Sequence, residues 1–66
     1  MKFKLVATIL EPSGAQAMIS APDGNVEFMK VGEKMGDEPN QAEVLEIQRD
    51  HVILSWHGER ISLAIQ

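Results

Sequence analysis

The chain contains no cysteine and no tyrosine, and its 66 residues include only two phenylalanines and one tryptophan. Without cysteine, no disulfide can cross-link the fold, and no thiolate can bind a metal ion or act as a nucleophile. This absence leaves the cellular compartment open. The few aromatic rings argue against a stacking platform for nucleic-acid bases, which needs exposed rings.

Basic residues are scarce and scattered. Six lysines and arginines stand against ten aspartates and glutamates, which gives a net charge of −4 and an isoelectric point near 4.9. A nucleic-acid-binding surface needs a cluster of basic side chains that binds the phosphates, so we do not expect nucleic acid as a partner. The only local basic excess is Lys2 with Lys4.

Long apolar runs are missing too. No segment approaches the ~18 residues that would indicate a membrane-spanning helix. The apolar stretch at residues 5–10 is shorter than the ~7–15 apolar residues of a signal peptide, and no small-residue cleavage site follows it, so we expect a strand there. We expect one small domain, residues 1–66, burying roughly 60% of its unfolded surface.

Two closely spaced turns near the C-terminal end are the strongest structural signal present. His57-Gly58 fits a two-residue hairpin turn, because glycine adopts positive φ freely and histidine does so more often than most residues. The register that this turn sets collects apolar side chains on one face of the sheet, since opposed residues share a face. The opposed pairs are Trp56 with Glu59, Leu54 with Ile61, and Val52 with Leu63; Ile65 extends the same face.

The preceding turn, Arg49-Asp50, is a weaker signal because it has no glycine. A two-residue loop there nevertheless extends the same apolar face. The pairs that it predicts are Ile47 with Val52 and Leu45 with Leu54. The agreement of two independent turns predicts a three-stranded antiparallel meander over residues 44–65.

The N-terminal half predicts a second meander, with strands at residues 2–10, 15–21 and 25–31. Pro12 and Gly14 favour a type I turn followed by a bulge, which sets Ile9 opposite Ala17 and Ala7 opposite Ile19. Pro22 and Gly24 favour a four-residue loop, and the pairs that follow are Ala21 with Val26 and Ile19 with Phe28. The predicted inner face consists of Leu5, Ala7, Ile9, Ala17, Ile19, Val26 and Phe28.

Residues 32–40 connect the two meanders and are too polar for a strand and too glycine-rich for a stable helix. We expect Val31 and Met35 to fill the core beside this connector. Each meander has one apolar face, and packing the two faces together hides both. The predicted fold is therefore all-β: a small six-stranded antiparallel sandwich or half-open barrel.

Catalysis, metal binding and cofactor binding are not expected. Asp50, His51, Ser55 and His57 supply the residue types of a hydrolytic triad, but four residues of strand separate His51 from Ser55 by about 13 Å. That exceeds hydrogen-bond reach. His57 in its turn diverges from His51, whereas zinc needs three or four converging ligands. Trp56 is expected to pack in the core rather than stack on a ligand.

Three segments carry a resemblance to a known family: VATILEPSGAQAMIS, VGEKMGD and VLEIQRDHVILSWHGERISL. They resemble the periplasmic homology domain of the type II secretion inner-membrane component GspC and the similar domain of the pilus-biogenesis lipoprotein PilP. The matching elements are Leu-Val-x-Thr-Ile at residues 5–9, Val-Gly-x-x-x-Gly at residues 31–36, and Asp50, Val52, Leu54, Gly58, Glu59 and Leu63. The match covers nearly all of residues 5–65. Ala7 departs from the family, which often has glycine there.

The resemblance implies a protein-interaction module that links an inner-membrane assembly to the N-terminal domain of an outer-membrane secretin. It also implies a small all-β sandwich, a periplasmic location and, in the full-length protein, a membrane tether; the family's anchor and linker are not within these 66 residues. The alternative function is a small β-barrel subunit that binds nucleic acid or a small ligand. The acidic charge and few aromatics argue against this alternative.

The expected partner site lies on the first strand. Residues 2–10 begin the first meander, so they are expected to form a sheet edge with unpaired backbone groups that invite strand addition. The outward residues of this strand are too apolar for a simply solvated face, and Met18 is expected to lie on the same outer face. The candidate partner-binding residues are Lys4, Val6, Thr8, Leu10 and Met18.

Overall fold

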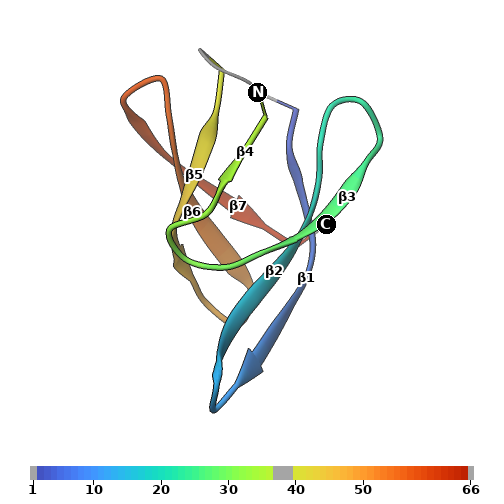
Figure 1. Cartoon of the computed structure of the whole chain (residues 1–66), viewed down its shortest axis with the longest axis vertical. Coiled ribbons are helices and arrows are strands. Elements are labelled where there is room, and N and C mark those ends of the chain that lie inside the picture. Colours follow the sequence, from blue (N-terminus) through green and yellow to red (C-terminus); the bar gives the residue numbers. More distant parts are fainter. Residues whose placement is uncertain (1, 37–39, 66) are drawn as a thin grey trace.

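The structure, a computed structural model, describes residues 2–36 and 40–65. Strands lie within these residues at β1 (Lys4–Glu11), β2 (Gly14–Ser20), β3 (Val26–Met29), β4 (Lys34–Met35), β5 (Ala42–Ile47), β6 (His51–Trp56) and β7 (Glu59–Ala64). They form a three-stranded sheet, sheet A, in the order β1-β2-β3, and a four-stranded sheet, sheet B, in the order β4-β5-β6-β7 (Figure 1). The predicted all-β sandwich is confirmed, with seven described strands rather than six. None of the described residues belongs to a helix that could cross a membrane.

The C-terminal hairpin has the predicted register. His57 and Gly58 both have positive φ, 52° and 78°, as the two-residue turn requires. All three predicted pairs between β6 and β7 are present. The inward residues Val52 and Leu54 are fully buried, whereas Ile65, expected on the inner face, is 42% exposed.

The β5–β6 pairing agrees with the prediction only next to the turn. Ile47 lies opposite Val52 as expected, but a bulge between Val44 and Glu46 then places Val44, not Leu45, opposite Leu54. An extra residue in one strand of a pair shifts the register and bends the strand. The prediction of Leu45 opposite Leu54 is therefore wrong, and Val44 takes the buried position.

The predicted register of the first hairpin is wrong. The β1–β2 loop has two residues rather than three, since Glu11 already pairs with Gly14. The shorter loop places Ala7, predicted on the inner face opposite Ile19, opposite Met18 on the outer face. A bulge at Val6, between Leu5 and Ala7, then places Leu5 opposite the buried Ile19. The same register moves Ile9 outward, opposite Gln16.

The second hairpin is also displaced by one residue. Its loop has five residues, because the amide of Ala21 donates to the carbonyl of Asn25 at 2.8 Å and closes it. The carboxylate of Asp23 accepts from the backbone and side-chain nitrogens of Asn25, both at 2.9 Å, which keeps Asn25 in the loop. The pairs that result are Ser20 with Val26, Ile19 with Glu27, Met18 with Phe28, and Ala17 with Met29. Val26 and Phe28 therefore leave the predicted core, and Met29 enters it.

The connector contains a short strand that its composition did not predict. β4 pairs with β5, and backbone hydrogen bonds from Gly32 to Val44 and from Val44 to Glu33 continue that contact. Met35 is buried as expected, but Val31 is 56% exposed, so its predicted core role is wrong. Residues 37–39 of the connector lie outside the described residues.

The core lies between the two sheets. Sheet A and Phe3, the residue directly before β1, contribute one half of the core, and sheet B contributes the other half. The buried residues are Phe3, Leu5, Ala17, Ile19, Met29, Met35, Ala42, Val44, Ile47, Val52 and Leu54. The sheets also meet along one side, where Leu5 of β1 bridges Ile65 in parallel. The β1–β2 turn and the β6–β7 turn lie at opposite ends of the long axis (Figure 1).

Candidate functional site

The outward side of sheet A carries a group of apolar side chains. The buried residues Ala17 and Ile19 of β2 mark the inward side, so Met18 between them lies on the outward side. Opposed residues share a face, and the register therefore gives rows across the sheet. The rows are Lys4–Ser20–Val26, Ala7–Met18–Phe28 and Ile9–Gln16.

Six residues make this surface, which we call the sheet A face: Val6, Ala7, Ile9, Met18, Val26 and Phe28. Phe28 is 54% exposed, Val26 51% and Val6 46%, while the other three are half-buried. Isolated exposed apolar side chains are common on proteins, but these lie on neighbouring strands around Met18. A contiguous apolar surface bordered by polar residues is typical of a protein-interaction site.

Charges of both signs border the sheet A face: Glu11, which pairs with Gly14, follows Ile9 on the outward side at the β1–β2 turn. Lys4 shares the row of Val26. Lys30 is exposed and lies directly after β3, where its amide donates to the Glu33 carboxylate at 2.7 Å and its carbonyl accepts from the Glu33 amide at 3.0 Å. Glu27 pairs with the buried Ile19 and so belongs to the inward side, at the edge of the sheet. The surface is therefore apolar in the middle and bordered by charges of both signs.

The outer edge of β1 is engaged by sheet B rather than free. Leu5 bridges Ile65, and the hydroxyl of Thr8 donates to the carbonyl oxygen of Arg49 at 2.5 Å. The amide of Ile65 in turn donates to the carbonyl of Asp50 at 3.1 Å, which holds the β7 end beside the β5–β6 turn. The prediction that this strand offers a run of unpaired backbone groups is therefore wrong at Leu5. The middle of the strand, at Thr8, is in contact with the β5–β6 turn.

The predicted partner-binding residues do not share one face. Lys4, Val6 and Met18 lie on the outward side of sheet A. Because of the bulge at Val6, the residues after it lie on the opposite side of the sheet from the one that simple alternation predicts. Thr8 therefore pairs with the buried Ala17 and belongs to the inward side. Leu10 follows the same inward parity at the strand end and is 50% exposed. Their role in binding stays a prediction, but the expected common surface is wrong.

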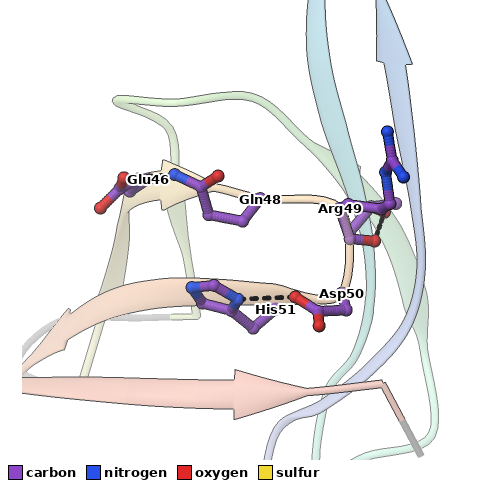
Figure 2. A network of polar contacts seen from close by, with 6 residues as sticks. Glu46, Gln48, Arg49, Asp50 and His51 are labelled. Carbon is purple, nitrogen blue, oxygen red and sulfur yellow. Dashed lines mark hydrogen bonds and ion pairs between the residues drawn. The ribbon is translucent and has the colours of Figure 1, made fainter.

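A second group of polar side chains surrounds the β5–β6 turn (Figure 2). Asp50 and His51 lie side by side, with His51 Nδ1 2.8 Å from Asp50 Oδ1. On the facing strand, the side-chain amide of Gln48 donates to the carboxylate of Glu46. The hydrogen bond with the His51 ring is the main cause that lowers the pKa of Asp50 below 3.8, and the charges of His51 and Arg49 add to it. These side chains are exposed to solvent, which weakens the electrostatic interactions between them.

The pKa of Asp50 provides a test of this pair. Because its folded-state pKa is lower than its unfolded one, the interaction contributes stability above pH 3.8 and loses it as the pH falls through the folded-state value. We expect His51→Gln to raise the Asp50 pKa toward 3.8, measured by carboxyl NMR titration. His57→Gln is the matched control and should leave the titration unchanged. An Asp50 pKa that is identical in the parent and His51→Gln would contradict the pairing.

The residue types considered for catalysis do not converge into a metal site. Among residues 2–36 and 40–65, no group of three or more histidine, cysteine or acidic side chains is placed to hold a metal ion. His57 lies away from His51, with its Nε2 2.9 Å from the side-chain oxygen of Asn40. Trp56 packs beside the core, and its ring meets His57 edge-on with centroids 4.2 Å apart.

Sequence reasoning missed the two most prominent residues of the surface. It assigned Val26 and Phe28 to the core, because both are apolar and alternate with polar residues as inward strand residues do. The signal available was the Asp23-Gly24-Asn25 segment, whose side chains favour a longer loop than the one predicted.

No family model matches the chain, and no curated protein matches it.

Proposed function

We propose that this domain is a protein-interaction module that binds its partner through the sheet A face. The observation that carries this proposal is the exposure of Val6, Val26 and Phe28 on neighbouring strands around Met18. Covering such a surface removes apolar area from water, at about 25 cal/mol per Å². Lys4, which lies in the row of Val26, then favours a partner with a carboxylate at that part of its rim.

The partner that we propose is the N-terminal domain of an outer-membrane secretin, with this domain as the link to an inner-membrane assembly. The support is the resemblance to the GspC and PilP domains at residues 5–9, 31–36 and 50–63, together with an all-β sandwich of the expected size. On this proposal the domain catalyses no reaction and needs no cofactor.

The test is titration calorimetry with the purified N-terminal domain of the secretin from the same organism. Val6 is exposed on the sheet A face and Ser62 is exposed on sheet B, so the pair Val6→Arg and Ser62→Arg compares the two faces. We expect Val6→Arg to weaken binding at least about tenfold, because a charge would be buried against an apolar partner surface. Ser62→Arg should change the affinity by less than about twofold, as rim or remote residues do.

Two results would contradict the proposal. One is binding that is lost in Ser62→Arg and kept in Val6→Arg, which would move the site to sheet B. The other is no secretin binding combined with salt-dependent binding of a single-stranded oligonucleotide, which would favour the nucleic-acid alternative. Thermal melting of each variant confirms that it remains folded.

A further inference from the structure

Among the described residues, β3 offers the strand edge best suited to accept another strand. β1 is engaged by Ile65 and by the β5–β6 turn, and β4 has only two residues. The outward residues of β7, including Arg60 and Ser62, are polar and exposed. β3 is the last strand of sheet A, and within the described part of the chain its one strand neighbour is β2. Within Val26–Met29 its other edge therefore presents backbone donors and acceptors to solvent.

The sheet A face extends to this edge through the side chains of β3. Val26 and Phe28 point outward and are more than half exposed, while Met29 is buried between the sheets. A strand added at this edge would extend the outward rows, so its residues opposite Val26 and Phe28 would enter an apolar environment. Apolar cross-strand pairs of this kind stabilise sheets by about 0.2–1 kcal/mol each.

The charge of Glu27 defines a register for the added strand. Glu27 lies on the inward side between Val26 and Phe28, whereas the backbone groups of Lys30, directly after β3, are bonded to Glu33 and end the open edge. Opposed unlike charges stabilise a strand pair, and opposed like charges destabilise it. An antiparallel segment that satisfies this register has an apolar residue opposite Phe28, a basic one opposite Glu27 and an apolar one opposite Val26.

A second copy of this chain fits the edge poorly. Antiparallel pairing of two β3 strands that keeps their faces aligned has two central registers. One places Glu27 opposite Glu27 of the copy, so that like charges meet. The other centres on Phe28 and places Glu27 opposite Met29 of the copy, which leaves the charge against an apolar side chain. The edge therefore disfavours self-association and selects a different strand.

We propose that β3 binds an extended segment of a partner protein by antiparallel strand addition, and that the segment has the pattern apolar-basic-apolar. Main-chain hydrogen bonds supply affinity in this mode, and the alternate side chains supply selectivity. The inference rests on the proposed function, because it names the chemistry of the partner at the sheet A face.

The test uses two peptides of identical composition. One is the blocked peptide Ser-Glu-Thr-Val-Lys-Val-Ser, and the other is Ser-Lys-Thr-Val-Glu-Val-Ser, in which the two charges are exchanged. Each is titrated into the ¹⁵N-labelled domain and followed by amide NMR shifts. We expect the first peptide to shift the β3 amides and to bind about three- to tenfold more tightly than the second. In the variant Glu27→Lys, whose change lies at an exposed position, this preference should reverse.

Several outcomes would overturn the inference. These are the absence of binding by either peptide, equal binding of both, shifts centred on β7 instead of β3, or a preference that does not reverse in Glu27→Lys. A concentration-dependent dimer in analytical ultracentrifugation that is lost on Phe28→Asp would assign the edge to a second copy. Binding of phosphatidylglycerol vesicles without peptide binding would assign the face to a membrane.

The peptide experiment is independent of the secretin. If the first peptide binds as expected but the secretin N-terminal domain does not, the proposed partner is wrong and the β3 inference stands. If the secretin domain binds the parent and Glu27→Lys equally and neither peptide binds, the inference is wrong and the proposed function stands.

Discussion

Replacing Leu54 with alanine is expected to unfold most of the domain. Leu54 is fully buried between Val44 on one neighbouring strand and Ile61 on the other. Truncating such a leucine costs about 2–5 kcal/mol, because transfer energy is lost and a cavity remains. At about 0.05–0.15 kcal/mol per residue, a domain of this length has only a few kcal/mol of total stability. Urea denaturation followed by tryptophan fluorescence should show a midpoint lowered to near zero.

Leu10→Ala is the matched control for this substitution. Leu10 lies at the turn end of β1 and is 50% exposed, so the same truncation removes much less buried area. We expect its effect on the free energy of unfolding to stay within about 0.5–1 kcal/mol. Equal denaturation midpoints for the two variants would show that Leu54 does not occupy the centre of the core.

The second large effect is expected from an aspartate at Met29. Met29 is 5% exposed, and a carboxylate there would be buried without a partner. Such a group has a raised pKa in the folded state, so the variant should be most stable below pH ~4 and lose several kcal/mol as the pH rises toward 7. Denaturation of Met29→Asp at both ends of this range measures the loss.

Phe28→Asp is the control for Met29→Asp, one residue away on the same strand. Phe28 is 54% exposed on the sheet A face, so its replacement should leave the unfolding free energy nearly unchanged between the two pH values. The register expected from the sequence predicts the opposite order, since it places Phe28 in the core. A Phe28→Asp variant that unfolds while Met29→Asp stays folded would support that register and contradict the structure.

The two halves of the chain differ in how far their registers follow from the sequence. In the C-terminal half, inward residues such as Val52 and Leu54 alternate with polar outward ones such as Ser55. A slip of one residue there would expose the whole apolar set, so the pattern specifies the register. In β1, Val6 and Ala7 are both apolar, and the sequence therefore does not distinguish the inward side from the outward one.

The residues predicted for the candidate site also differ in whether the structure places them on the predicted side of the sheet. Reasoning from sequence named Lys4, Val6 and Met18 for the outer face, and the structure places them there. It also named Thr8 and Leu10, which the bulge at Val6 moves to the other parity. A bulge of this type requires no glycine or proline, so nothing in the local sequence marks it. The exposure of Phe28 follows from the one-residue difference in the β2–β3 loop.

By itself the sequence determined an all-β chain of two meanders, the turn at His57-Gly58 and the burial of Val52 and Leu54, because the two-residue positive-φ turn acts locally and sets which residues share a face. Only the tertiary structure decided the two bulges, the closure of β1 against Ile65, and which apolar residues of sheet A face solvent. The physical reason is that both sides of sheet A are apolar. The register of sheet A therefore depends on which of its residues fit against sheet B. This packing joins segments that are far apart in the sequence, so the local pattern of residues does not determine it.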